Sequence, residues 1–179
     1  QGIVATTSSL YRLTVNVAGE TFSAEAFMPE PAVLDSLTYI PVANFFGPPP
    51  EGPPKFNVFL NFQDPPASNF YRAVYARNGN LKNDLSDLQI FDDAITNGNY
   101  ITIPIFNQEY KLGDTANVAL LTMDASVYTF LETFTSAASA DAGSPFSAAP
   151  DNPISNIEGG ALGVFAAYAR TEGVVVIGE

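Results

Sequence analysis

"KFNVFLNFQD", residues 55–64, decides the fold class of this chain, because apolar side chains recur in it at every second position. The members of this apolar set are Phe56, Val58, Leu60 and Phe62. Successive side chains of a β-strand point to opposite faces, so a period of two is typical of a strand that buries one face. The stretch therefore predicts a strand of a mainly β protein.

Further stretches with strand patterns lie on both sides of residues 55–64. They are residues 10–17, 20–27, 34–42, 69–79, 99–106 and 115–123. Ala18-Gly19 separates the first two, and a glycine-containing turn between two alternating runs predicts a hairpin. Residues 80–93 are acidic and show no such pattern, so we expect them to be irregular.

One stretch, DASVYTFLETFTSAASA (residues 124–140), has helical spacing instead. Its apolar side chains recur every three or four residues, at Val127, Leu131, Phe134 and Ala138. Asp124 can cap the first turn, because its carboxylate can accept the free amide protons there. Together the patterns predict an antiparallel β-sandwich with one α-helix, residues 124–140, near the C-terminal third.

The stretch NPISNIEGGALGVFAAYAR (residues 152–170) could be a ligand site or the entry to a closing hairpin. The run after Gly160 is apolar or small on both faces, which is typical of a strand buried on both sides. β-Branched residues return at 174–177, so we predict a C-terminal hairpin over residues 161–177 with its turn at 171–173. A phosphate-binding loop would need a lysine or a helix N-terminus after the glycines, and neither follows.

We interpret residues 152–160, here called the clasp, as a structural element that leads the chain into this hairpin. Asn156 has a short amide that can hydrogen-bond nearby backbone groups and hold a turn. Gly159 and Gly160 permit positive φ, or a bulge, where the predicted strand begins. The alternative is a recognition site, in which the same residues contact a ligand or partner.

The charge of the chain argues against nucleic-acid binding. It has 19 acidic and 7 basic residues, a net charge of −12, whereas a nucleic-acid-binding protein needs clustered Lys and Arg. The same excess of acidic residues argues against binding to an anionic lipid surface. No apolar run approaches the roughly 20 residues that a membrane-spanning helix needs.

The absence of His and Cys restricts the chemistry that the chain can perform. It excludes Ser–His–Asp and Cys–His nucleophile systems, and also zinc sites with His or thiolate ligands. Two carboxylates could still hydrolyse a glycoside, but 19 acidic residues offer such a pair in any fold, and most carboxylates are solvated surface charges. We therefore expect no enzymatic activity, no catalytic residue and no bound cofactor.

One acidic stretch, residues 83–93, could hold calcium. It carries Asp84, Asp87, Asp92 and Asp93, and calcium accepts six to eight oxygen ligands from irregular loops. The spacing fits no EF-hand loop, so a solvated acidic loop is the alternative interpretation.

The proline-rich stretch NFFGPPPEGPP, residues 44–54, predicts a stiff, exposed loop, because proline fixes φ and lacks a ladder donor. Phe45 and Phe46 lie on it. Aromatic rings on a rigid loop provide contact area at low entropic cost, so both are candidate contacts for a partner protein. Alternatively, one ring folds back onto the sandwich.

Four stretches resemble successive blocks of one protein family. They are YRLTVNVAGETFSAEAFMPEPAVLDSL, FQDPPASNFYRAVYARNG, YKLGDTANVALLTMDASVYTFLETF and SNIEGGALGVFAAYAR. In this order they are similar to the domain-of-unknown-function family 4249, predicted cell-envelope lipoproteins of the Bacteroidota. The family brings no established catalytic residues.

Genes of this family often accompany those of TonB-dependent outer-membrane receptors. The resemblance therefore implies an exported, lipoprotein-derived accessory protein at the outer membrane or cell surface. Its implied role is to bind, and to work with a TonB-dependent receptor in nutrient capture.

The chain departs from the family pattern at its start, where there is no lipobox Cys. Residues 1–28 resemble only the last hairpin of the family's immunoglobulin-like N-terminal domain, and residues 29–179 form the predicted β-sandwich domain. Either the rest of that N-terminal domain was removed, or another chain supplies strands to the hairpin. The second possibility implies another function: a structural surface or filament subunit that self-assembles by β-strand exchange.

Overall fold

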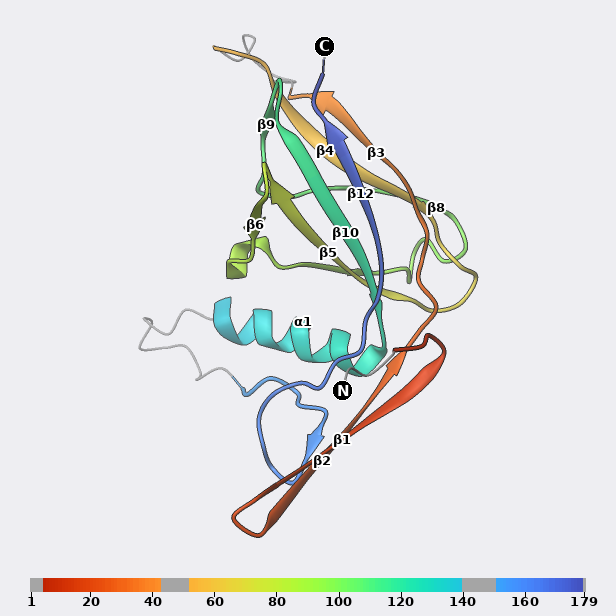
Figure 1. The fold of residues 1–179 in the computed structure, drawn as a ribbon, viewed down its shortest axis with the longest axis vertical. Helices are drawn as coiled ribbons and strands as arrows, with labels where there is room; N and C mark the ends of the chain where they lie inside the picture. Colours follow the sequence, from red (N-terminus) through yellow and green to blue (C-terminus); the bar gives the residue numbers. More distant parts are fainter. Residues whose placement is uncertain (1–4, 43–51, 140–150, 179) are drawn as a thin grey trace. The chain divides into compact units, whose positions relative to one another are not determined.

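The computed structural model describes residues 5–42, 52–139 and 151–178 (Figure 1). Three antiparallel sheets and one α-helix confirm the predicted mainly β class. The chain divides into two compact units: unit 1 comprises residues 1–30 and 122–169, and unit 2 comprises residues 31–121 and 170–179. The sequence placed the first hairpin and the helix in separate domains, whereas both fall within unit 1.

Two of the sheets belong mainly to unit 2. The first has the strand order β3 (Leu34–Pro41), β4 (Lys55–Gln63), β8 (Tyr100–Pro104), and β9 (Tyr110–Lys111) also pairs with β4. The second has the order β12 (Ala169–Val176), β10 (Thr115–Met123), β5 (Phe70–Arg77), β6 (Asn80–Lys82), and β7 (Gln89–Asp92) also pairs with β5.

The core of unit 2 lies between these two sheets. On β4, the alternating set predicted from the sequence is the buried one, and Val58, Leu60 and Phe62 have no exposed surface. Tyr71 of β5 meets Phe62 edge to face, with ring centroids 5.0 Å apart. Side chains of β10, among them Leu120, complete the cluster. Burial of these large side chains provides most of the driving force for folding of a sandwich.

Residues 80–93 are more regular than the sequence predicts. They contain β6, a 3₁₀-helix η1 (Leu85–Asp87) and β7, and both strands pair with β5. Strands of three and four residues are too short for a period of two to be recognised. Gln89 can be buried because its side-chain amide donates to Pro104 O at 2.8 Å and accepts from Phe106 N at 3.1 Å.

The third sheet belongs to unit 1 and has the order β1 (Ser9–Val17), β2 (Glu20–Met28), β11 (Ile157–Glu158). The predicted hairpin is confirmed. Ala18 (φ +52°) and Gly19 (φ +89°) connect its strands, and positive φ at both positions is the signature of a type I′ turn, which suits the twist of paired strands.

The predicted helix is confirmed within one residue at each end as α1 (Ala125–Ser139). Asp124 caps it, because one carboxylate oxygen accepts from Val127 N at 3.0 Å, and the other accepts from Phe27 N of β2 at 2.7 Å. Of the predicted apolar stripe, Val127 and Leu131 are buried and Phe134 is 39% exposed. Asp124 therefore ties the start of the helix to the hairpin. Among the described residues, no helix is both long and apolar enough to cross a bilayer.

The predicted C-terminal hairpin over residues 161–177 is wrong. Residues 161–168 form no strand, and residues 171–173, the predicted turn, lie inside the single strand β12. Gly173 marks a close approach rather than a turn, because a Cβ there would lie 3.1 Å from the Leu34 side chain. The apolar run before it is diverted by contacts with side chains of the clasp, described below.

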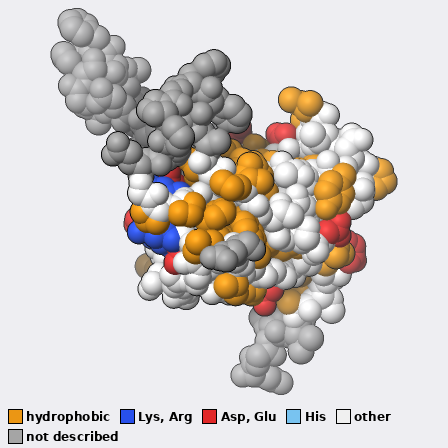
Figure 2. Space-filling view, turned by 90° about the horizontal axis from the view of Figure 1, so that it is seen from above, with side chains coloured by type: hydrophobic (Ala, Val, Ile, Leu, Met, Phe, Trp, Pro, Cys, Tyr) orange, Lys and Arg blue, Asp and Glu red, His pale blue; other side chains and the backbone are white. Residues whose placement is uncertain are grey.

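Many large hydrophobic side chains remain on the surface. Figure 2 shows hydrophobic side chains of all sizes gathered in the middle of the face seen from above. Ile40 and Phe106 of unit 2 are more than half exposed, and so is Val17 of the hairpin. Single exposed apolar residues are normal, whereas grouped ones mark binding surfaces.

Candidate functional site

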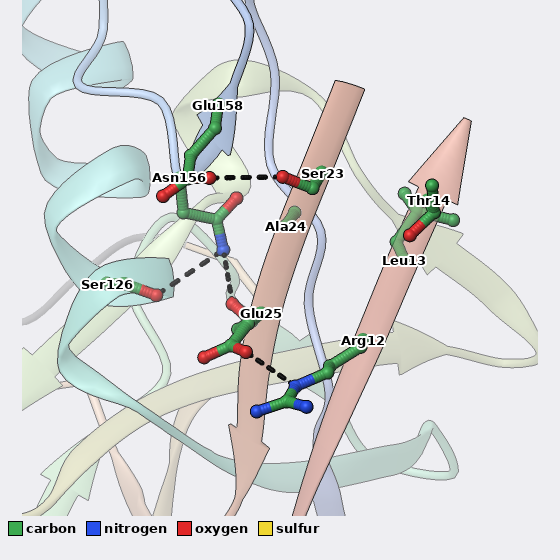
Figure 3. A pocket seen from close by; sticks show the side chains of 9 residues that line it. All are labelled: Arg12, Leu13, Thr14, Ser23, Ala24, Glu25, Ser126, Asn156 and Glu158. Carbon is green, nitrogen blue, oxygen red and sulfur yellow. Dashed lines mark hydrogen bonds and ion pairs between the residues drawn. The ribbon is translucent and has the colours of Figure 1, made fainter. Parts of the chain in front are cut away.

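A groove of about 380 Å³ opens on unit 1, and we call it the hairpin groove (Figure 3). β1 and β2 form one side of it, and the start of α1 and the clasp form the other. The polar residues that line it are Arg12, Thr14, Ser23, Glu25, Ser126, Asn156 and Glu158, and Leu13 and Ala24 add apolar surface.

The strand register places the polar side chains of the hairpin groove on one sheet face. Arg12 lies opposite Glu25, and Thr14 lies opposite Ser23. On the other side of β2, Glu158 of β11 is also opposite Ser23. Residues directly opposite one another in an antiparallel pair point to the same face. The two-residue turn of the hairpin therefore determines which side chains meet.

The charged groups of the hairpin groove are already partnered. Arg12 Nε lies 2.6 Å from Glu25 Oε1, and these side chains are 72% and 55% exposed. Ser23 Oγ donates to Glu158 Oε2 at 3.1 Å. An exposed ion pair of this kind contributes about 0–1 kcal/mol to stability. Its main effect here is to neutralise Arg12 and Glu25, so that Glu158 carries the one uncompensated charge among the lining residues.

Asn156 holds the wall of the hairpin groove by contacts with backbone groups. Its side-chain amide donates to Phe165 O at 2.8 Å and accepts from Phe165 N at 2.9 Å. It also donates to Glu25 O at 3.2 Å and to Ser126 Oγ at 3.4 Å. Figure 3 shows the Asn156 amide between β2 and the first turn of α1. One amide thus connects the clasp to β2, α1 and the following chain.

The same contacts explain why residues 161–168 form no strand. Asn156 occupies both backbone groups of Phe165, as a neighbouring strand would. Ser155 Oγ donates to Gly163 O at 2.8 Å, and Gly163 itself has φ +146°. Side chains therefore bind backbone groups of Gly163 and Phe165 that a sheet ladder would otherwise pair.

The sequence predicts that Gly159 and Gly160 stand at the start of a strand. In the structure they follow the end of β11, and no strand begins at them. Both have positive φ, +94° and +87°. A Cβ on Gly159 would lie 2.8 Å from Thr21 O and 3.0 Å from the Phe22 ring, whereas a Cβ on Gly160 would meet nothing within 4 Å. Gly159 is thus required both for the backbone conformation and for the close approach to β2.

The hairpin groove offers groups for binding more readily than for acid catalysis. Glu25 and Glu158 both line it, and glycoside hydrolysis uses two carboxylates. The general acid of such a pair must be kept protonated, typically by an apolar surrounding. Both of these carboxylates are exposed. Glu25 lies beside the Arg12 guanidinium, and Glu158 accepts a hydrogen bond from the Ser23 hydroxyl. This arrangement suits hydrogen bonding to a polar ligand.

Comparison with known protein families identifies the chain. The model of a family described as a domain of unknown function (DUF4249) matches residues 3–173. The chain belongs to the DUF4249 family. The predicted resemblance is therefore confirmed, and the match includes every residue of the hairpin groove. Neither the curated proteins nor the solved structures gave a match to the DUF4249 chain.

The structure does not bring the four calcium candidates of the DUF4249 chain together. Asp87 accepts from Asp84 N at 3.2 Å in the turn of η1, and Asp92 accepts from Ala94 N at 3.1 Å. Asp93 is buried and accepts from Asn69 N at 2.8 Å. Within residues 5–42, 52–139 and 151–178, no three acidic side chains are placed to hold a metal ion. Three of the four candidates bind backbone amides instead.

A buried carboxylate that the sequence analysis missed, Asp64, lies near Asp93. Asp64 accepts from Gly98 N at 2.8 Å and from the Tyr71 hydroxyl. Burial, together with the charges of Asp64 and Asp92, raises the pKa of Asp93 above the usual aspartate range, although backbone hydrogen bonds oppose the rise. Burial and the hydrogen bond to Asp64 also raise the pKa of Tyr71. These groups join the loops at one end of the sandwich.

The partner-contact candidates Phe45 and Phe46 lie outside the described residues. The groove residues Arg12, Ser23 and Glu25 were missed by the sequence analysis, although a signal for them was present. Once Ala18-Gly19 is recognised as a two-residue turn, the register of β1 and β2 follows, and it places these polar side chains on a single face.

Proposed function

We propose that this DUF4249 protein is a non-enzymatic, lipoprotein-derived binding protein of the outer membrane or cell surface. In this proposal it works as an accessory of a TonB-dependent receptor in nutrient capture. The hairpin groove is the observation that supports a binding role, because it presents hydroxyl, amide and partnered charged groups around an open hollow. Family membership supports the envelope setting only through the resemblance described above.

The hairpin groove suits a polar, uncharged segment of a partner. Thr14 offers a hydroxyl that can donate or accept. The hydroxyl oxygens of Ser23 and Ser126 can still accept, because their protons bond to Glu158 and Asp124. Arg12 and Glu25 neutralise each other, and the Glu158 carboxylate leaves one negative charge, so the groove disfavours an anionic ligand. A receptor loop rich in hydroxyl and amide groups has this chemistry.

The proposal is tested by affinity purification from the detergent-solubilised envelope of the native host, followed by mass spectrometry. Ser23→Arg fills the hairpin groove. Asn16→Arg is the matched control, because it adds the same side chain to an exposed position of β1 outside the groove. We expect a TonB-dependent receptor to co-purify with wild type and with Asn16→Arg, and to be lost with Ser23→Arg. Absence of any such receptor from the wild-type sample would contradict the proposal.

A specific feature of β1 favours the second candidate function, a subunit that assembles by strand exchange. β1 is nine residues long, and no described strand pairs with its outer edge. It contains no proline, lysine or bulge, the usual protections of an edge. Three edges of unit 2 are protected: β3 has a register shift between Leu34 and Ser36 and ends at Pro41, β8 ends at Pro104, and β6 has three residues including Lys82. A further edge strand, β12, has eight residues and, like β1, contains neither proline nor lysine.

Size-exclusion chromatography with light scattering separates the two functions. An accessory protein forms a discrete heteromer with a large membrane protein, whereas strand exchange gives an open-ended polymer. Val17→Lys places a charge at the exposed end of β1. If the protein assembles by strand exchange, Val17→Lys should form shorter polymers than wild type. If it is a receptor accessory, the heteromer should form equally well with Val17→Lys and with wild type.

A further inference from the structure

A second groove, of about 880 Å³, lies on unit 2, and we call it the β4 groove. Its volume is within the range of roughly 300–1,000 Å³ that is usual for small-molecule sites. Because Val58 and Leu60 of β4 point into the core, Asn57 and Phe59 point to the opposite face of the sheet. These two side chains line the β4 groove together with Ile40 of β3, Arg77 of β5 and residues 104–109.

The register of the sheet gives the β4 groove an apolar platform. Phe59 lies opposite Pro104 on one side of β4, and Asn57 lies opposite Ile40 on the other. Ile40 is 53% exposed and Phe106 is 54% exposed, although folding alone would favour their burial. Together these aromatic and aliphatic side chains form a strip against which a ligand can pack a flat face made of C–H groups.

Amide groups border this platform. The Asn57 side chain is only half-buried and makes no hydrogen bond to another described residue. Gln108 Oε1 is buried and has no partner among the described residues. The Asn107 side-chain nitrogen donates to Ser86 O at 2.6 Å, which leaves the side-chain oxygen Oδ1 as an acceptor. The β4 groove thus has donors and acceptors that the fold itself does not use.

The ionised groups of the β4 groove are neutralised in pairs. Lys55 Nζ lies 2.5 Å from Glu109 Oε2, and Arg77 lies 2.6 Å from Asp114 Oδ2. The groove therefore contrasts with the chain as a whole, whose net charge is −12. A ligand that depends on a full charge gains little from paired groups, whereas a neutral ligand with many hydroxyls can use the amides and the Glu109 carboxylate.

We propose that the β4 groove binds a neutral carbohydrate, with one sugar ring packed on Phe59 and Phe106 and its hydroxyls bonded to Asn57 and Glu109. A pyranose ring combines an apolar face with a rim of hydroxyls, which matches the apolar strip and the bordering amides. This site is in unit 2 and goes beyond the proposed function, because binding there needs neither the hairpin groove nor a receptor.

The test is isothermal titration of the purified full chain with short neutral oligosaccharides of glucose, xylose, mannose and galactose, and with an acidic oligosaccharide of galacturonate. The groove variants are Phe106→Ala and Asn57→Ala. Phe134→Ala is the matched control, because it removes a partly exposed phenylalanine from α1 in unit 1. Thermal melting of each variant confirms that it is folded.

We expect at least one neutral oligosaccharide to bind wild type and Phe134→Ala equally, and to bind both groove variants about tenfold more weakly or worse. The inference is overturned if no neutral oligosaccharide binds wild type. It is also overturned if the folded groove variants bind as wild type does, or if the acidic oligosaccharide binds more tightly than the neutral ones. No receptor is present, so failure here leaves the proposed function unaffected.

Discussion

In β4 of unit 2, alternate side chains are fully buried and the backbone pairs with strands on both sides, whereas residues 161–168 of unit 1 carry an equally apolar sequence and form no strand. The difference lies in what satisfies the backbone. On β4 the neighbouring strands do so, and in unit 1 the side chains of Asn156 and Ser155 do so. Stability is therefore spread over many contacts in unit 2 and concentrated in a few around the clasp.

The largest effect is expected for Leu60→Ala in the core of unit 2. Leu60 has no exposed surface, so truncation leaves a cavity and costs about 2–5 kcal/mol of unfolding free energy. Val33→Ala is the control, because Val33 is 64% exposed and its truncation costs about 0.5 kcal/mol or less. Urea denaturation followed by circular dichroism measures both. Equal costs would show that the β4 core does not dominate the stability of unit 2.

The next largest loss of unfolding free energy is expected for valine substitutions at the two glycines of the clasp. Gly160→Val is expected to cost about 1–3 kcal/mol because φ is positive there, and Gly159→Val about 2–4 kcal/mol because the new side chain also meets Thr21 O. Thermal melting of the two variants gives the order. A larger cost at Gly160 than at Gly159 would mean that the clasp does not lie against β2 as described.

Alternation made the strongly buried parts of the fold predictable from the sequence. The apolar residues of β4 alternate because they share the face that forms the core, so its pattern is unambiguous, and the helix is marked by both its spacing and Asp124. The path of residues 161–168 was not predictable, because a two-sided apolar run does not show whether a strand or an asparagine side chain satisfies its backbone. That choice depends on Asn156 meeting Phe165, nine positions further along the chain.

A smaller effect is expected for Asn156→Ala, which removes the amide of the clasp. Loss of its bonds to Phe165 and Glu25 should cost about 1–2 kcal/mol. Asn156→Asp keeps the acceptor for Phe165 N but sets a carboxylate oxygen against Phe165 O and Glu25 O, so its melting temperature should also lie below that of wild type. If the clasp is structural, partner binding falls only in proportion to the unfolded fraction. Unchanged melting with lost binding would instead make Asn156 a recognition residue.

The smallest effects are expected from two buried aspartates of unit 2, and they have opposite pH dependence. The pKa of Asp93 is raised, so its contribution to stability is present at low pH and is lost as pH rises through the folded-state pKa. Burial alone would raise the pKa of Asp114, but the hydrogen bonds from Asn78, Lys111 N and Arg77 outweigh burial, and the net pKa is lowered. The contribution of Asp114 to stability is therefore lost as pH falls through the folded-state pKa.

Urea midpoints of Asp93→Asn and Asp114→Asn between about pH 3 and pH 7 measure these contributions. Relative to wild type, Asp93→Asn should gain stability as pH rises, and Asp114→Asn should lose it. Parallel pH profiles for the two variants would contradict the assigned pKa directions.

The hairpin groove was less predictable than the fold, because each of its residues is an ordinary polar position on an exposed strand. Ser23 and Glu158 are 135 positions apart in the chain and meet only because β11 pairs with β2. A pairing between strands of two and nine residues leaves no sequence pattern. Only the half contributed by β1 and β2 could be predicted, through the register that their turn imposes.

The most direct test of the difference between the two units is native-state hydrogen exchange, read by mass spectrometry, for wild type and Asn156→Ala. Amides of residues 163–167 should lose protection by about tenfold or more in the variant, because Phe165 N no longer has an acceptor. Amides of residues 56–62 in β4 should exchange as in wild type. Unchanged protection at residues 163–167, or an equal loss in β4, would contradict the conclusion that a single asparagine holds the clasp while unit 2 is stabilised by its own core.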